Sequence, residues 1–213
     1  MTDPALAVSP PALEEFRAAA RHRLPAARGP EGHWVGELSS SALSTATAVF
    51  ALRIAGRERL AARGAAWLDA HRNGDGGFGD TPGGPSNVST TTLCWAALGD
   101  ARTESWLRRE IGDLSPAALA KTIGRVYGVD RTFSAPILAM GALAGRIPWS
   151  EVPPLPFELA ALPRSWFGAL GLPVVSYALP ALIAVGLARH VHRPGWNPFR
   201  PLAGGIHIHE RDL

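Results

Sequence analysis

The sequence has 213 residues, of which 46% are hydrophobic, enough for a sizeable buried core. Its net charge is +3 and its basic residues are scattered, so nucleic-acid binding is not predicted. The single cysteine, Cys94, excludes an internal disulfide and fits a reducing compartment, and the N-terminus lacks the pattern of a signal peptide. We therefore expect a cytoplasmic protein with one domain over 1–202 and a tail over 203–213.

Proline, glycine and N-capping residues divide the chain into predicted helices. Ser9 and the two prolines after it begin the first helix, which ends at Leu24 and carries Glu14-Glu15 on its polar side. Further helices are expected over 41–55, 58–72, 87–98, 103–111, 115–128 and 133–143. Pro136 is expected in the first turn of the last of these, where a missing amide is harmless. No long segment alternates with period two, so the predicted fold class is all-α.

Two segments share one order of features: a glycine-aromatic turn, a cluster of hydroxyl residues and an apolar helix. Trp34 and Phe78 occupy matching places in the two turns, roughly 45 residues apart, which is the length of a helix-pair repeat. In the second copy Asn87 is a predicted N-cap and Gly99 a predicted terminator. Cys94 lies on the apolar helix between them, and we expect it to be buried.

The helix expected over 58–72 carries Leu60, Trp67 and Leu68 on one side. Asp75 and Asp80 flank the turn that follows this helix, and they are most simply turn formers.

The last third of the chain changes character. Prolines stiffen 148–163 into an extended loop with apolar anchors such as Trp149. Residues 166–188 then run for 23 positions without a charge, which is long enough for a transmembrane helix. Pro173, Pro180 and glycines favour a different arrangement, two shorter buried helices broken near 171–173. Both arrangements remain open on composition alone.

Several motifs together resemble the squalene–hopene and oxidosqualene cyclases. They are GHWVGELSSS at 32–41, Arg63-Gly64 with Trp67-Leu68 and the turn at 76–78, DTPGGPSNVSTT at 80–91, Arg131-Thr132-Phe133, and IPWSEVP at 147–153. The resemblance covers roughly 10–202. Two departures stand out in the repeat, because His71 sits near the family's Gln and Phe78 replaces its Trp. The resemblance implies part of an α/α toroid and favours buried helices over a membrane span, with peripheral membrane contact.

The resemblance also names candidate residues for the wall and entrance of a polyprenoid cavity, where aromatic faces stabilise carbocations. Phe133 and Tyr177 match cavity positions, Arg131 belongs to the same motif as Phe133, and the entrance candidates are Trp149, Trp166 and Phe167. The alternative is that these aromatics are ordinary core residues. No cofactor and no metal site are predicted, although His207, His209 and Glu210 in the tail form a weak metal-binding pattern.

The family's catalytic acid, an Asp-X-Asp-Asp cluster that protonates the substrate, does not occur in this sequence. Thr47 and Leu93 stand where family members usually carry glutamates. The resemblance therefore implies a class II terpene cyclase fold, an isomerase family, without deciding whether this chain is an enzyme. The leading hypothesis is a non-autonomous subunit or fragment that completes a cavity with an acid-bearing partner chain. The alternative is a non-catalytic hydrophobic-ligand-binding or membrane-associated scaffold.

Overall fold

The computed structural model describes residues 9–36, 38–155, 157–158 and 179–194, and every regular element among them is a helix. This confirms the predicted all-α class, while the partial toroid stays a prediction. Contacts divide the chain into two compact units, Met1–Ser39 and Ser40–Leu213, each of which is described by itself. The helices are α1 (Pro10–Ala26), α2 (Ala42–Ile54), α3 (Glu58–Ala70), α4 (Val88–Leu98), α5 (Ala101–Ile111), α6 (Pro116–Tyr127), α7 (Arg131–Leu143), the short 3₁₀-helix η2 (Trp149–Glu151) and α9 (Leu179–His192).

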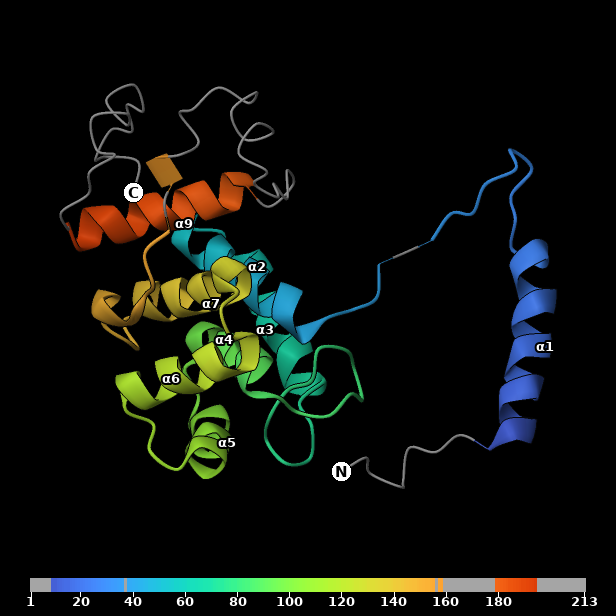
Figure 1. Cartoon of the computed structure of the whole chain (residues 1–213), viewed down its shortest axis with the longest axis horizontal. Helices are drawn as coiled ribbons and strands as arrows, with labels where there is room; N and C mark the ends of the chain where they lie inside the picture. The colour runs from blue at the N-terminus through green and yellow to red at the C-terminus, as the bar shows by residue number, and fades with distance from the viewer. Residues whose placement is uncertain (1–8, 37, 156, 159–178, 195–213) are drawn as a thin grey trace. The chain divides into compact units, whose positions relative to one another are not determined.

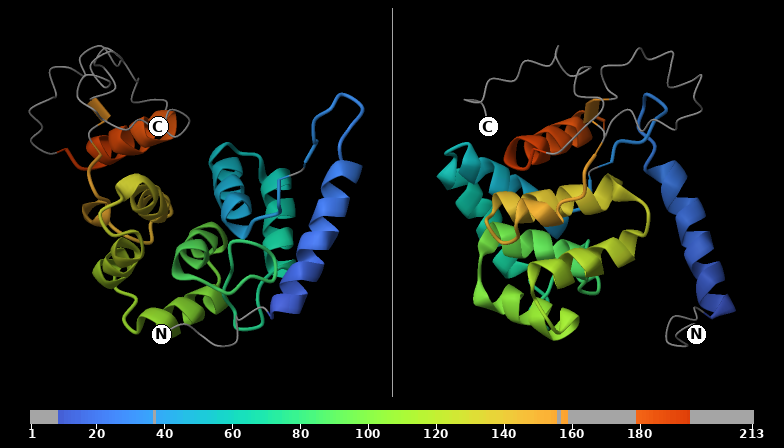
Figure 2. Two further views of the ribbon diagram at one scale, coloured as in Figure 1. Left: turned by 45° about the vertical axis from the view of Figure 1, so that its right-hand side comes forward. Right: turned by 60° about the vertical axis from the view of Figure 1, so that its left-hand side comes forward.

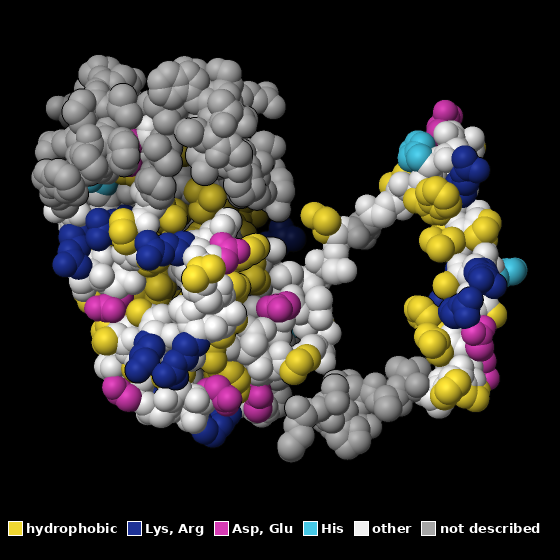
Figure 3. All heavy atoms as spheres, viewed as in Figure 1, with side chains coloured by type: hydrophobic (Ala, Val, Ile, Leu, Met, Phe, Trp, Pro, Cys, Tyr) yellow, Lys and Arg dark blue, Asp and Glu magenta, His cyan; other side chains and the backbone are white. Residues whose placement is uncertain are grey.

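The first unit consists of α1 and the loop that follows it. Hydrophobic side chains gather along one side of α1 and charged ones along the other (Figure 3), and none of its residues is buried. The loop folds back on the end of the helix, because the Trp34 indole N–H donates to the Leu24 carbonyl at 2.6 Å. Arg28 lies over the Trp34 ring, which is 54% exposed. The turn therefore closes on its own helix.

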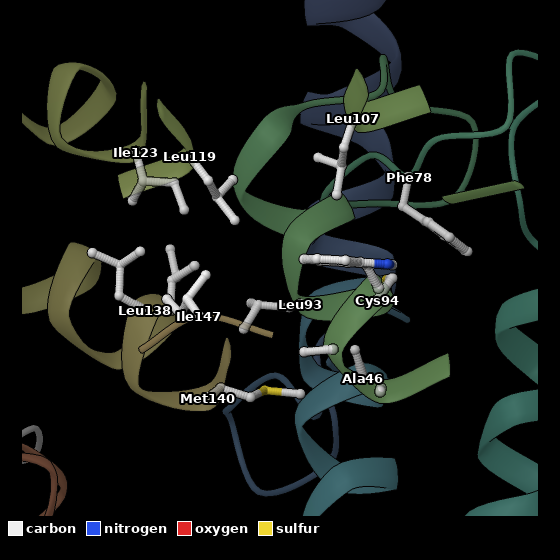
Figure 4. Close-up of a cluster of buried hydrophobic side chains, with 14 of the residues drawn as sticks. Ala46, Phe78, Leu93, Cys94, Leu107, Leu119, Ile123, Leu138, Met140 and Ile147 are labelled. Atoms are coloured by element: carbon white, nitrogen blue, oxygen red, sulfur yellow. The ribbon is translucent and has the colours of Figure 1, made fainter. Parts of the chain in front are cut away.

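The second unit is built around α4, which contacts α2, α3, α5, α6 and α7 (Figure 1). Nine of its eleven residues are buried. Figure 4 shows Leu93 pointing toward the side chains of α6 and α7, whereas Cys94 lies on the other side of α4, near Phe78 and Ala46. The predicted burial of Cys94 is confirmed. Because α4 is buried on all sides, its stability depends on the neighbouring helices that surround it.

Both ends of α4 are fixed as the sequence predicts. The Asn87 side chain accepts a hydrogen bond from the Thr90 N–H at 2.9 Å and so caps the first turn. At the other end Gly99 adopts φ +69°, a left-handed conformation that ends the helix, and its N–H donates to the Trp95 carbonyl.

Helices α2 and α3 form a closely packed pair. A Cβ atom at Gly64 would lie 2.5 Å from a Val49 methyl group, so only glycine permits this approach. The predicted apolar side of α3 is partly wrong. Leu68 is buried but Leu60 is 44% exposed, and the small residue next to it, Ala61, is buried in its place.

Two helices begin two residues earlier than predicted, because an aspartate precedes each of them. The Asp100 carboxylate accepts from the Arg102 and Thr103 N–H groups, and the Asp130 carboxylate accepts from the Thr132 N–H at 2.8 Å. The placement of Pro136 in the first turn of α7 is therefore wrong. It lies in the second turn, where its missing amide leaves one intrahelical hydrogen bond unmade.

The last described helix, α9, packs against α7 (Figure 2). A Cβ atom at Gly186 would lie 2.8 Å from the Phe157 Cβ, so glycine again sets the approach of the two segments. Among the described helices, none combines the length and apolar character that a membrane crossing requires. The predicted helix break near 171–173 falls outside the described residues.

Candidate functional site at the start of α7

The connection between α6 and α7 presents two aromatic rings together. Gly128, at φ +60°, ends α6, and Asp130 starts α7, so the chain reverses within three residues. This tight turn brings the Tyr127 and Phe133 rings into a stack, with centroids 5.6 Å apart and planes 22° from parallel. Arg131 is the first residue of α7, two positions before Phe133, and is exposed.

Apolar side chains around this pair are unusually open. Phe133 is 57% exposed, Val126 is 60% exposed and Val129 is fully exposed. Together with Tyr127 these residues form what we call the α6–α7 patch. Tyr127 is half-buried and packs against the hydrophobic core. Single exposed hydrophobic residues are ordinary, but three exposed ones close together in sequence make this connection a candidate binding surface.

The patch stands on a rigid base. Leu119 and Ile123 of α6 are at most 1% exposed, and Leu138 of α7 is 3% exposed; Figure 4 shows these side chains gathered between the two helices. The Ser134 hydroxyl at the start of α7 also donates to the Asp130 carbonyl. The two aromatic rings are therefore held by packed helices rather than by a free loop.

Trp149 belongs to a different cluster at the other end of α7. Its ring stacks on His192 at 4.5 Å and 6°, while His190 lies against Phe157 at 5.8 Å. Arg189 donates to the Val152 carbonyl at 3.3 Å, so the last turn of α9 holds the segment around η2. Phe133 and Leu143 are ten positions apart, which is about 15 Å along the helix. Arg131 and Phe133 thus share the first turn of α7, while Trp149 lies apart from them near the end of α9.

Three further candidates, Tyr177, Trp166 and Phe167, lie outside the described residues, as do His207, His209 and Glu210. Within the described part of the chain, no group of three His, Cys, Asp or Glu residues could hold a metal ion.

The glycine-rich turn before α4 contains a polar network whose extent the sequence did not predict. Asp75 accepts hydrogen bonds from the Gly77 N–H and the Ser86 hydroxyl at 2.9 Å and from the Trp106 indole at 3.0 Å. Burial raises the pKa of this carboxyl, but these bonds and the nearby Arg109 charge outweigh it and leave the pKa below its usual value. Asp75 is thus a connection between the turn and α5.

Asp80 plays the corresponding part at the start of α4. Its carboxylate accepts from the Asn87 amide at 2.9 Å and from the Thr90 hydroxyl, the same two residues that form the N-cap. Both aspartates are turn formers, as predicted, and both also fix a helix.

Arg72 is a buried cation that sequence reasoning missed. Its side chain is 6% exposed, pairs with Asp69 at 2.8 Å and Asp100 at 3.0 Å, and lies 4.8 Å from the Phe78 ring centroid. Burial lowers the pKa of this guanidinium, but the two carboxylates raise it above its ordinary value. One of its partners is 28 positions away, so no local pattern could have revealed the pair.

Comparison with known proteins identifies the family. The squalene-hopene cyclase N-terminal domain matches residues 18–178, which is most of the chain. The chain belongs to this family. The resemblance inferred from the motifs is therefore confirmed, and the α6–α7 patch and Trp149 both lie inside the matched region.

Three fungal proteins are similar to this cyclase-family chain. A terpene cyclase-glycosyl transferase fusion protein of Humicola fuscoatra is 31% identical over 88% of this chain and 14% of its own length. The enfumafungin synthase of Hormonema carpetanum is 32% identical over 78% of this chain and 12% of its own length. A squalene hopane cyclase of Aspergillus fumigatus is 28% identical over 82% of this chain and 22% of its own length. No solved structure matches significantly.

The chain thus spans between 12% and 22% of the length of these relatives. The two positions at which the resemblance to the cyclase family leads us to expect glutamates, 47 and 93, carry non-acidic side chains in this chain. The Thr47 hydroxyl donates to the Leu43 carbonyl of its own helix at 3.0 Å. Leu93 is 5% exposed and part of the hydrophobic core.

Proposed function

We propose that this squalene-hopene-cyclase-like chain supplies part of the wall of a cavity for a squalene-like polyprenoid. In this proposal it is a subunit or fragment, and an acid-bearing partner chain supplies the proton that starts cyclisation. The observation that carries the proposal is the open Tyr127–Phe133 stack within the part of the chain that matches the cyclase domain. The similarity to a terpene cyclase fusion protein and to a squalene hopane cyclase supports this substrate class.

The chemistry of the patch suits this role. An aromatic face stabilises a developing carbocation by about 1–2 kcal/mol once water is excluded. Within the described part of the chain Phe133 remains 57% exposed, so its ring is not shielded from water there. Closure by the partner would bury the patch and desolvate its rings. In the same proposal, Arg131 flanks the wall, Tyr177 adds to it, and Trp149, Trp166 and Phe167 line or support the entrance.

The test is a turnover assay with squalene and geranylgeranyl diphosphate, read by mass spectrometry. The chain is assayed alone and then mixed with a cyclase-family chain that carries the Asp-X-Asp-Asp motif. We expect cyclised product only in the mixture. Product from the chain alone would contradict the argument from the missing acid.

A matched pair of variants ties the activity to the patch. Phe133→Leu removes the ring but keeps apolar bulk, and we expect it to lower the rate of the mixture by about tenfold, the equivalent of one cation–π contact. Phe16→Leu makes the same change at a phenylalanine of α1 that is 71% exposed, and the rate should not change. Equal effects of both variants would contradict a specific role for Phe133.

The scaffold hypothesis makes a different prediction for the same patch. A non-catalytic hydrophobic-ligand-binding or membrane-associated protein would bind squalene, or vesicles, through the exposed apolar residues without product in either assay. Binding that Phe133→Asp abolishes, with no turnover in the mixture, would favour this alternative.

A further inference from the structure

A polar cavity of about 560 Å³ lies between the glycine-rich turn and α5, and none of its lining residues belongs to the α6–α7 patch. Three arginines and two aspartates line it together with small residues. The lining residues are Asp69, Arg72, Asn73, Gly74, Asp75, Gly76, Ala101, Arg102, Ser105 and Arg109.

The aspartates of this cavity are already occupied. Asp69 pairs with Arg72 at 2.8 Å, and Asp75 accepts from three separate donors. The depressed pKa of Asp75 agrees with this, since those donors stabilise its charged form. Asp75 keeps its negative charge near Arg109, and the three arginines and two aspartates of the lining leave one net positive charge in the cavity.

The groups that remain uncommitted are donors. Arg102, Ser105 and Arg109 follow one another at i, i+3 and i+7, which places them on one face of α5. Among the described residues, neither Arg102 nor Arg109 forms an ion pair with a carboxylate, whereas Arg108, on a different face, pairs with Glu104 at 2.7 Å. One Arg109 nitrogen donates to the Asp75 carbonyl at 2.9 Å, which holds its guanidinium over the turn.

We propose that this cavity binds a phosphate-type oxyanion between Arg102 and Arg109, with the Ser105 hydroxyl as a further donor. Guanidinium groups match the geometry of phosphate oxygens and form charge-assisted hydrogen bonds with them. The volume exceeds that of one phosphate, so a diphosphate or an organic phosphate also fits. This site is independent of the proposed cyclase role, because it uses no residue of the patch.

The experiment titrates the full chain with inorganic phosphate and pyrophosphate at constant ionic strength, followed by isothermal calorimetry. We expect saturable one-to-one binding that weakens about tenfold in Arg102→Gln and in Arg109→Gln. The matched control, Arg108→Gln, removes the same charge from the same helix and should bind as the parent does. Circular dichroism and urea unfolding confirm that each variant is folded.

A second arm separates the sources of the phosphate group. Vesicles that contain phosphatidic acid are compared with soluble pyrophosphate, and binding of either that depends on Arg102 supports the site. If no probe binds saturably, or if Arg108→Gln weakens binding as much as Arg102→Gln, the proposal is wrong. Since turnover is not measured, neither result depends on the outcome of the cyclase assay.

Discussion

The connection between the glycine-rich turn and α5 depends on Asp75, and Asp75→Asn tests it. The two carboxylate oxygens have separate partners, since Oδ1 accepts from the Gly77 N–H and the Ser86 hydroxyl and Oδ2 accepts from the Trp106 indole. An asparagine offers one acceptor and one NH₂ group, so in either orientation a donor faces a donor. The variant keeps the size of the side chain and changes only its hydrogen-bonding pattern.

The expected magnitude follows from the burial of Trp106. This residue is 3% exposed, and a buried N–H left without an acceptor costs about 1–3 kcal/mol. Asp75 itself is exposed, so the loss of its charge adds little after solvent screening. We therefore expect Asp75→Asn to lower the free energy of unfolding by about 2 kcal/mol, measured by urea denaturation followed by circular dichroism.

Two further variants make the test specific. Asp113→Asn makes the same charge change at a fully exposed carboxylate that serves only Ser115, and we expect a smaller loss of stability. Trp106→Phe removes the indole N–H, so Asp75→Asn should cost about 1 kcal/mol less in that background than in the parent. The reasoning is refuted if Asp75→Asn lowers the free energy of unfolding equally in the parent and in Trp106→Phe, or if Asp113→Asn destabilises as much as Asp75→Asn.

The remaining predictions concern the reactivity of Cys94, the loss of stability in acid through Asp100, and the end of α4 at Gly99. Burial raises the pKa of Cys94 to about 12, so the native chain should not react with a thiol reagent at neutral pH, and reaction should begin only in denaturing urea. Burial raises the pKa of Asp100, but hydrogen bonds from Thr103 and Arg72 lower it below its usual value. The ionised Asp100 therefore stabilises the folded state above about pH 3.9, the pKa of an aspartate in the unfolded chain, and this stabilisation is lost as the pH falls through the lower pKa of the folded state. We expect the urea midpoint to fall in acid, and to fall less steeply in Asp100→Asn. Gly99→Ala should cost about 1 kcal/mol in urea unfolding, because its φ is +69°, whereas Gly74→Ala, with open space around it, should be neutral.

Local sequence signals predicted most of the helices because the signals that end helices are local. Asn87 and Gly99 bound α4 where the sequence placed them, since a side-chain cap and a left-handed glycine act within one turn. The early starts of α5 and α7 were missed although Asp100 and Asp130 are also local caps. In both cases the apolar pattern begins two or more residues after the capping aspartate, so a helix start predicted from the apolar pattern comes too late.

The candidate site was harder to predict, because it depends on contacts between distant segments. The family motifs singled out Arg131 and Phe133, but Tyr127, the stacking partner of Phe133, precedes the motif and carried no signal of its own. Arg72 was missed for the same reason, since Asp100 is distant in sequence. Leu60 was placed on the apolar side of its helix but is 44% exposed. The sequence shows which residues share a helical face, but it does not show which neighbouring segment covers that face.

The two ends of α7 explain why the patch can be rigid and still incomplete. The middle of the helix is buried, with Ile137, Leu138 and Ala139 each at most 5% exposed, so its direction is fixed by the α4 core. At its start, Ser134 and Ala135 are also buried, whereas Phe133 beside them is 57% exposed. In the subunit or fragment proposal, a partner that covers this stack would gain the burial energy of the ring without having to order its side chain, because α7 already fixes its position.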